Sequence, residues 1–414
     1  MAERRQPIQI DAAMLQHYIE ALGSIGRQAE GGIVRPVYSA AWVQARGQLA
    51  AWMRAAGLDV REDSVGNLFG RLRGVDDSRT ILTGSHLDTV PLGGKFDGTL
   101  GILSGLVALR ALREQAGQPR RSLEVVALCE EEGSRFQAHY WGTRGMLGLV
   151  GADELERLRD DQGMTISEAM RAAGLSPERY REAVRHDLDA FIELHIEQGR
   201  ILFDERVDLG IVQAIVGLQH QWVTVRGRAD HAGTTPMHLR RDALLGAAQM
   251  AVEITRLVEQ EGRPAVVTFG KWEVKPGAVN VIPDEVSFSI DLRHPEEETK
   301  RRLATAVRAC CQAIARERGL VVSSEITSDS PPVPMDAALQ SILISSAEAC
   351  GARWRAMPSG AGHDSQEMAR HLPTAMLFVQ SREGRSHSAA EYTTQEDAAR
   401  GATVLATALH QLAY

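Results

Sequence analysis

The 414-residue sequence lacks the features that mark secreted, disulfide-rich and nucleic-acid-binding proteins. Its four cysteines, Cys129, Cys310, Cys311 and Cys350, form no CxxC pair and show no even spacing. This argues against a disulfide framework or a zinc ribbon and favours reduced core thiols. The chain carries 46 Lys and Arg against 54 Asp and Glu, so its net charge of −8 creates no basic field for a polyanion. We therefore expect no nucleic-acid partner.

Long apolar runs are also missing. The longest nearly apolar stretch, residues 99–109, is far shorter than the roughly 20 residues that a bilayer requires. Residues 1–11 carry several charges and lack the apolar core of a signal peptide. The composition, 44% apolar and 24% charged, is ordinary for a globular protein with a sizeable core. We expect a cytoplasmic protein of two or three domains with no membrane partner.

Short apolar runs alternate with amphipathic stretches in the first half of the chain. The runs are residues 67–72, 80–83, 123–129 and 191–194, and the clearest amphipathic stretch is residues 100–113. Ser39 can cap a helix that runs to about Ala56, with Gly57 in the left-handed position that ends it. Buried strands that alternate with helices predict an α/β domain, a mainly parallel sheet covered by helices.

The pattern changes after about residue 213. The elements expected there are, in order, a strand at residues 222–227, a helix at 244–258, strands at 265–274 and 285–292, a helix at 303–314 and a strand at 320–326. This β-α-β-β-α-β order predicts a split-βαβ, ferredoxin-like α+β domain. We expect residues 214–329 to be this inserted domain, and residues 1–213 and 330–414 to form the domain that receives it.

The clearest chemistry begins after the apolar run at residues 80–83. His86 and Asp88 stand two residues apart, on one side of an extended chain, so Asp88 can orient the His86 imidazole. Asp97 follows among glycines that permit a tight bend. A lone His-x-Asp is often structural, and the glycine loop lacks the Gly-x4-Gly-Lys-Ser/Thr order of a phosphate-binding loop.

Further acids and histidines stand at the ends of other apolar runs. They are Glu130, Glu131 and Glu132 after residues 123–129, His195 after residues 191–194, and His387 near the end of the chain. Taken singly, they are equally well explained as a solvated charge run and hydrogen-bonded core histidines. Taken together, they are expected to converge on the carboxyl edge of one parallel sheet.

Such a cluster predicts a dinuclear metal site. Imidazole and carboxylate ligands suit zinc, manganese or cobalt better than metals that prefer thiolate. Two ions need a bridging carboxylate, and together they lower the pKa of a water molecule enough for attack on a carbonyl. A carboxylate that is not a ligand must still accept the proton and pass it to the leaving nitrogen.

Seven motifs in order resemble one known family. They are GSHLDTVPLGGKFDG, EEEGSRF, HIEQG, DHAGTTPM, GAVNVIPDEVSFSIDLR, SGAGHD and SHSAAEYT, and they span nearly the whole chain. The resemblance is to the M20 metallopeptidase-like amidohydrolases, in the branch of allantoate amidohydrolases and N-carbamoyl-L-amino-acid hydrolases. It implies a hydrolase of non-peptide C–N bonds with two divalent ions (Zn, Mn or Co) per chain.

The resemblance also implies a role for each site residue. His86, Asp97 and His195 match the ligands of one metal; Asp97, Glu131 and His387 match those of the other, with Asp97 bridging. Glu130 matches the general base and Asp88 the residue that orients the first histidine.

The inserted domain matches a lid and dimerisation domain, so a homodimer is expected. His231, Asn280 and Arg293 in it match substrate contacts, as do Gln198 and His363 elsewhere; a bidentate pair with a substrate carboxylate would suit Arg293. Ser365 stands where the motif usually has alanine, and Ala389 where it usually has proline.

The expected reaction is hydrolysis of a ureido or carbamoyl C–N bond in a small carboxylate. Residues 130–136 and 140–143 look closer to allantoate amidohydrolases, which release ammonia and CO2, whereas carbamoylases more often read NEEGARF and lack Trp141. An N-carbamoyl-L-amino-acid hydrolase is the alternative. An aminoacylase, a dipeptidase or a non-catalytic homologue that binds metal and ligand also stays open.

Overall fold

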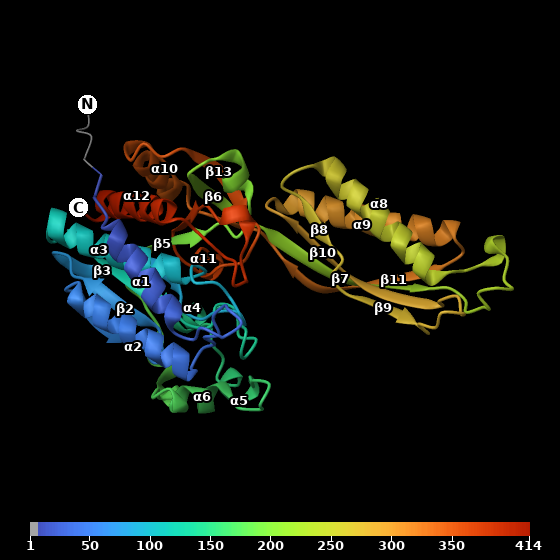
Figure 1. The fold of residues 1–414 in the computed structure, drawn as a ribbon, viewed down its shortest axis with the longest axis horizontal. Coiled ribbons are helices and arrows are strands. Elements are labelled where there is room, and N and C mark those ends of the chain that lie inside the picture. The colour runs from blue at the N-terminus through green and yellow to red at the C-terminus, as the bar shows by residue number, and fades with distance from the viewer. Residues whose placement is uncertain (1–6) are drawn as a thin grey trace. The chain divides into compact units, whose positions relative to one another are not determined.

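The computed structural model describes residues 7–414, so the first six residues of the charged amino-terminal segment lie outside the described part of the chain. The chain forms two compact units. Unit 1 comprises the described residues up to Gln213 together with Pro334–Tyr414, and unit 2 comprises Ala214–Val333. Unit 2, coloured yellow-green to orange in Figure 1, is therefore an insertion in the sequence of unit 1.

Unit 1 contains a nine-stranded sheet. Its strands are β1 (Asp59–Glu62), β2 (Leu68–Leu72), β3 (Asp76–His86), β4 (Arg121–Leu128), β5 (Leu188–Ile196), β6 (Leu209–Ile215), β12 (Val333–Pro334), β13 (Trp354–Ser359) and β14 (Thr374–Val379). The order is β1-β2-β4-β3-β5-β14-β6-β12, with β13 paired to β6. The central strands β4, β3, β5 and β14 are parallel, so their carboxyl ends meet at one edge, where α/β sheets bind ligands.

The helices of unit 1 connect its strands, and several begin at a side-chain cap. They are α1 (Ala12–Ser24), α2 (Ala40–Ala55), α3 (Thr99–Ala116), α4 (Trp141–Met146), α5 (Glu154–Arg157), α6 (Ile166–Ala172), α7 (Ile201–Glu205), α10 (Ala337–Ala349), α11 (Asp364–Met368) and α12 (Gln395–Ala413), with 3-10 helices η1 (Pro177–Ala183) and η3 (Arg382–Gly384). The Ser39 side chain accepts the N–H of Trp42, and Gly57 adopts a φ of 77° after α2, which confirms the predicted cap and stop.

Both faces of the central strands are buried, because successive side chains of a strand point to opposite faces. Ile81 and Val125 belong to an apolar cluster that includes α3 and α12, whereas Leu82 and Val126 belong to one that includes α4 and α11. This double burial explains the continuous apolar runs. It confirms the predicted α/β class, a mainly parallel sheet covered by helices.

Unit 2 is an antiparallel sheet with helices on one face. Its elements are β7 (Gly217–Arg226), η2 (Met237–Leu239), α8 (Ala243–Glu261), β8 (Val266–Thr268), β9 (Trp272–Lys275), β10 (Glu285–His294), α9 (Glu297–Glu317) and β11 (Val321–Ser330), and the strand order is β11-β7-β10-β8 with β9 paired to β10. Alternate residues of β7 are buried, as expected for a sheet covered on one side by α8 and α9.

The prediction of one strand at residues 265–274 is wrong. The structure divides this stretch into β8 and β9, which pair with different parts of β10. At the break after Gly270, the N–H of Lys271 donates to the Ser289 hydroxyl, at 3.0 Å, so a side chain replaces the backbone acceptor of a continuous ladder. The rest of the β-α-β-β-α-β order agrees with the prediction.

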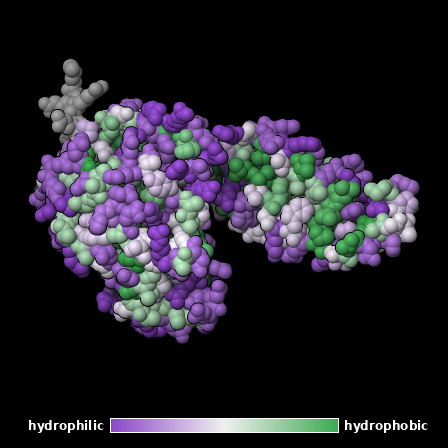
Figure 2. All heavy atoms as spheres, viewed as in Figure 1, coloured by the Kyte–Doolittle hydropathy of each residue, from purple (hydrophilic) through white to green (hydrophobic). Residues whose placement is uncertain are grey.

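Large exposed apolar side chains are concentrated in unit 2. Figure 2 shows hydrophobic patches on the visible face of unit 2, whereas the visible face of unit 1 is mostly hydrophilic. Exposed residues of this kind include Leu245, Val252, Val266, Val321 and Ile326. Within residues 7–414, no helix combines the length and apolar character that crossing a membrane requires.

Candidate metal centre

Asp97 lies at the centre of three histidines. Its Oδ1 atom is 3.4 Å from Nε2 of His86 and 3.1 Å from Nε2 of His195, and its Oδ2 atom is 3.3 Å from Nε2 of His387. His86 ends β3 and His195 stands one residue before the end of β5, so two adjacent parallel strands deliver their rings to the same edge of the sheet. The structure thus brings three of the predicted ligands around Asp97 and places the fifth, Glu131, beside His86.

The spacing of these atoms fits divalent cations. Nitrogen and oxygen ligands at about 2.0–2.2 Å from one tetrahedral ion lie about 3.3–3.6 Å apart, close to the separations of 3.1–3.4 Å around Asp97. Asp97 Oδ1 is buried and hydrogen-bonds to no described residue, although a buried acceptor normally has a partner. Because each oxygen of Asp97 faces a different histidine set, the carboxylate is placed to bridge two ions.

Several residues around the site have left-handed backbone conformations, which are unfavourable for residues other than glycine. Gly98 has a φ of 64°, and a Cβ atom there would lie 2.5 Å from the His86 ring, so only glycine fits between Asp97 and α3. Glu130, Gln198 and His387 also have left-handed backbones, with φ of 53°, 57° and 52°. Such residues cost about 1–3 kcal/mol each and cluster at functional sites.

The Asp88 carboxylate supports the acidic run more directly than it supports His86. It accepts the N–H groups of Glu131 and Glu132 at 3.1 and 3.2 Å. Its Oδ1 atom is 3.9 Å from Nδ1 of His86, whereas the backbone oxygen of Asp88 is 3.1 Å from the same nitrogen. In the structure, the backbone oxygen of Asp88, and not its carboxylate, therefore forms the hydrogen bond that orients His86.

The three consecutive acids face different ways. Glu130 Oε1 accepts the N–H groups of Arg135 and Phe136 at 3.2 and 2.9 Å, so this side chain holds the loop that follows it. Ligand-type atoms of Glu132, Asp97 and His387 lie within 4.8 Å of one another, and so do those of Glu131, His86 and Glu132. This grouping differs from the predicted one, which put Glu131 with Asp97 and His387 and left Glu130 as the base.

Burial makes this run unfavourable when it is fully ionised. Burial raises the pKa of Glu130 to about 8 and that of Glu132 to about 7, and it raises the pKa of Glu131 well above its usual range. Neighbouring carboxylates add to each rise. A cluster of this kind is stabilised by bound positive charge.

Gln198 and His363 occupy different environments. Gln198 Nε2 donates to Asp97 Oδ2 at 2.9 Å, and its Oε1 atom is buried with no hydrogen-bond partner among the described residues. His363 is buried, packs edge-on against His195 at a centroid distance of 4.5 Å and lies 3.0 Å from the Ser359 hydroxyl. Burial lowers the pKa of His363 well below its usual range, so the ring is neutral.

A buried acid that the sequence analysis missed lies behind the histidines. Glu193 accepts hydrogen bonds from the hydroxyls of Ser85 and Ser365, at 2.7 and 2.6 Å. It stands two residues before His195 on β5, so the period of two could have placed both on one face. Ser365, which departs from the usual alanine, therefore serves as a donor to a buried carboxylate.

The predicted contacts in unit 2 lie on two segments. His231 Nδ1 accepts the Gly233 N–H at 3.0 Å, which puts the proton of the neutral ring on Nε2. The backbone oxygen of Asn280 accepts the Ala232 N–H, so Asn280 lies beside the His231 segment. Arg293, on β10, donates twice to the Asp291 carboxylate, at 2.9 and 2.8 Å.

Known proteins with similar sequences and folds share most of this chain. The pattern of peptidase family M20/M25/M40 matches residues 82–411. An allantoate amidohydrolase of Escherichia coli (strain K12) is 39% identical over 97% of this chain and 100% of its own. An N-carbamoyl-L-amino-acid amidohydrolase of Paenarthrobacter aurescens is 42% identical over 91% and 92%. The crystal structure of a hydantoinase/carbamoylase family amidase from Burkholderia ambifaria, 35% identical, superposes with a TM-score of 0.94 over 99% of both chains.

Proposed function

Because the chain belongs to peptidase family M20/M25/M40 and is an amidohydrolase, we propose that it hydrolyses the carbamoyl C–N bond of allantoate, with release of ammonia and CO2. The observation that supports a ureido substrate is the position of the Gln198 side-chain amide beside Asp97. Its nitrogen is held by Asp97 Oδ2, and its buried oxygen has no donor among the described residues. That oxygen would accept an N–H of a ureido group.

Two divalent cations, Zn, Mn or Co, would occupy the centre. His86, Asp97 and His195 would hold one, and Asp97, Glu132 and His387 the other. Bound there, the cations would lower the pKa of a water molecule and polarise the scissile carbonyl. Glu132 replaces the predicted Glu131 as a ligand because it groups with Asp97 and His387.

Glu131 would then be the general base in place of Glu130. It lies beside His86 and Glu132 but outside both ligand sets, whereas Glu130 belongs to no such cluster among the described residues and its Oε1 atom accepts two backbone N–H groups. Glu131 would accept the proton of the attacking water and deliver it to the nitrogen that leaves as ammonia. The carbamate left on the other ureido nitrogen would then lose CO2, and that nitrogen would take up a proton. The Asp88 carboxylate would position Glu131 and Glu132 through their backbone N–H groups.

Residues of unit 2 would complete substrate binding. The Nε2–H of His231 would donate to the carbonyl oxygen as charge develops on it. Arg293 would exchange the Asp291 carboxylate for that of the substrate, with Asn280 as a further polar contact. His363 would act on the site only through its packing against His195.

The choice of allantoate rests on residues 130–136 and on the full-length similarity to an allantoate amidohydrolase. Trp141, the other sequence signal, is fully buried and donates to the Tyr38 hydroxyl, so it shapes the core and is not available to substrate. The second candidate is an N-carbamoyl-L-amino acid, which the 42% identity to an N-carbamoyl-L-amino-acid amidohydrolase favours.

Ammonia release tests the proposal directly. We would compare kcat/KM for allantoate and a panel of N-carbamoyl-L-amino acids by ammonia release, each with added zinc, manganese or cobalt. An N-acetyl amino acid and a dipeptide, whose hydrolysis releases no ammonia, would be followed by the free amino acid that they yield. Allantoate is expected to give the highest value. A value for N-carbamoyl-methionine or N-carbamoyl-phenylalanine more than about tenfold higher, near 1.4 kcal/mol in transition-state binding, would make the second candidate correct.

Unit 2 would also form a two-fold homodimer. Its exposed apolar side chains support this, because large apolar patches on soluble proteins mark interaction surfaces. Isologous dimers are the commonest assembly. Sedimentation of the purified chain would measure the expected dimer mass.

A further inference from the structure

A buried carboxylate that the proposed mechanism does not use joins two segments of the metal centre. Glu391 is 5% exposed, and its Oε1 atom accepts the backbone N–H groups of Phe96 and Asp97 at 2.9 and 3.0 Å. The Ser386 hydroxyl lies 3.1 Å from Glu391 Oε2 and 3.0 Å from Asp97 Oδ2. One side chain therefore contacts both the residues that precede α3 and the loop that carries His387.

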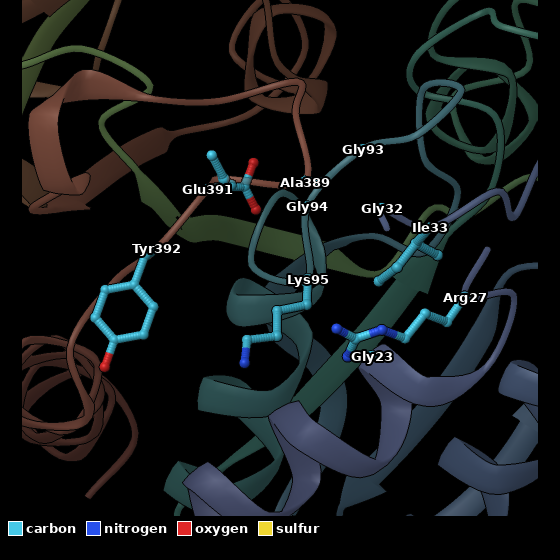
Figure 3. A pocket seen from close by; sticks show the side chains of 11 residues that line it. Gly23, Arg27, Gly32, Ile33, Gly93, Gly94, Lys95, Ala389, Glu391 and Tyr392 are labelled. Carbon is cyan, nitrogen blue, oxygen red and sulfur yellow. The ribbon is translucent and has the colours of Figure 1, made fainter. Parts of the chain in front are cut away.

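A glycine makes this contact possible. A Cβ atom on Gly94 would lie 2.1 Å from Glu391 Oε1, whereas one on the neighbouring Gly93 would meet Val90 at 3.2 Å. Neither glycine has a φ in the left-handed range, so alanine can adopt both backbone conformations. Figure 3 shows Glu391 lying beside Gly94. The approach of the carboxylate thus depends on the missing side chain of Gly94.

The rings of Phe96 and Tyr392 pack edge-on between these segments, at a centroid distance of 5.9 Å, but a cavity separates the segments on one side. A cavity of about 230 Å³ lies against both, and Gly93, Gly94, Ala389 and Glu391 are among the residues that line it. His387 also has a left-handed backbone, which persists only where surrounding contacts hold it. The Glu391 hydrogen bonds therefore join the two segments beside this cavity, together with the Ser386–Asp97 hydrogen bond.

We propose that Glu391 is a positioning residue that ties the Asp97 segment, residues 93–97, to the His387 segment, residues 386–392, and so sets the affinity of the cation site between them. This inference rests on the proposed function, because it needs Asp97 and His387 to be ligands. Residues that orient metal ligands change metal affinity about 10- to 100-fold when they are replaced. Glu391 reaches the ligands through backbone N–H groups and Ser386 rather than by touching the ion.

The test measures bound zinc and uses a pair of glycine variants. Wild-type enzyme, Gly94→Ala and Gly93→Ala are loaded with zinc and dialysed at a series of buffered free-zinc concentrations, and zinc per chain is determined by elemental analysis. Gly94→Ala displaces the carboxylate without removing it, and Gly93→Ala adds the same methyl group one residue away. We expect Gly94→Ala to lose one of two ions at a free-zinc concentration about tenfold higher than wild type or Gly93→Ala.

Two further variants identify the lost ion and guard against misfolding. His387→Ala removes a proposed ligand and so shows what the zinc-binding curve looks like when that ion is lost. Glu391→Ala should change the zinc-binding curve in the same way but less strongly. Excess zinc should restore the kcat of Glu391→Ala and leave its KM unchanged. Glu391→Gln keeps the volume and one acceptor, so it should fold and give a smaller shift. Zinc binding like wild type in Gly94→Ala and Glu391→Gln would overturn the inference. A wild-type chain that binds no zinc, manganese or cobalt would instead overturn the proposed function.

Discussion

Glu132 Oε1 lies 3.6 Å from Nε2 of His387. This contact brings the third acid of the run at residues 130–132, and not the second, to the histidine on the far side of Asp97. Asp88 fixes the direction of the run by accepting the N–H groups of Glu131 and Glu132. Each of the three acids therefore has different surroundings, and substitution can test whether their roles differ.

Glu131→Gln should keep two metal ions per chain and lower kcat by roughly 10²-fold or more, because a positioned base contributes about that much. Glu132→Gln should lose one ion, since an amide is a weaker ligand than a carboxylate. Glu130→Gln is the matched control, because its amide oxygen can still accept the two loop N–H groups. Near-normal turnover in Glu131→Gln with a large loss in Glu130→Gln would return the base to Glu130.

Removal of metal should abolish activity and lower thermal stability. A chelator should take both ions, and zinc, manganese or cobalt should restore turnover and raise the unfolding temperature, because a ligand that binds the native state stabilises it. Activity should also fall below neutral pH, since histidine ligands bind metal only when neutral. Active enzyme without metal by elemental analysis would contradict the dinuclear site.

Ser365→Ala should destabilise the protein by about 1–3 kcal/mol, because it leaves the buried Glu193 carboxylate with one hydroxyl donor fewer. Urea unfolding measures this cost. Ser341→Ala on the exposed face of α10 is the control and should change the free energy of unfolding by less than about 0.5 kcal/mol. The loss of unfolding free energy caused by Ser365→Ala should be smaller in a Glu193→Gln variant. An equal loss with and without Glu193→Gln would exclude an energetic coupling between Ser365 and Glu193.

Asp187 should stabilise the fold in a pH-dependent way. Burial raises its pKa, but hydrogen bonds from Arg185 and Thr80 outweigh burial and hold the pKa below its usual value. A carboxyl group whose pKa is lower in the folded state stabilises the fold fully at any pH above its unfolded-state pKa, about 3.9. That stabilisation is lost as the pH falls towards the folded-state pKa. Asp187→Asn should therefore cost about 1 kcal/mol at pH 7 and progressively less below pH 4.

The control for Asp187 is Asp189→Asn, which removes one exposed ion pair with Arg121. Denaturant unfolding of metal-free protein from pH 7 to pH 2.5 compares the two. An Asp187→Asn cost that stays constant or grows as the pH falls would contradict the sign of the shift.

His231 should act on the metal centre of the partner in a homodimer, as the family resemblance implies. His231→Ala and Glu131→Gln should each be inactive alone. Mixed dimers would hold one site with both wild-type residues, so random exchange should restore about a quarter of wild-type activity. No recovery after confirmed subunit exchange would mean that His231 acts within its own chain.

Local patterns in the sequence were enough to predict the sheet and the histidines that meet Asp97 at its edge. The apolar runs before His86 and His195 predicted parallel strands, and those strands deliver both rings to Asp97. The order of elements in unit 2 followed from the same periodicities, except at Gly270. These predictions succeeded because strand alternation and strand direction depend on neighbours along the chain.

The assignment of the acidic run could have been improved from the motif itself. EEEGSRF and NEEGARF share their last two glutamates when their Gly and Arg-Phe residues are aligned, and those glutamates are Glu131 and Glu132. In the structure, the left-handed backbone of Glu130 breaks the alternation of an extended chain, so strand periodicity does not apply to the acids that follow it. A non-glycine residue gives no local warning of such a conformation.

The sequence by itself determined which ligand-type side chains are available and the edge of the sheet at which they meet, because both follow from periodicity and residue chemistry. Only the tertiary structure decided which acid faces His387, that Ser365 serves Glu193, and that Glu391 reaches Asp97 past Gly94. These are contacts between segments distant in the chain, made by buried polar groups that must find a partner on folding. Their partners are set by packing, which no local pattern encodes.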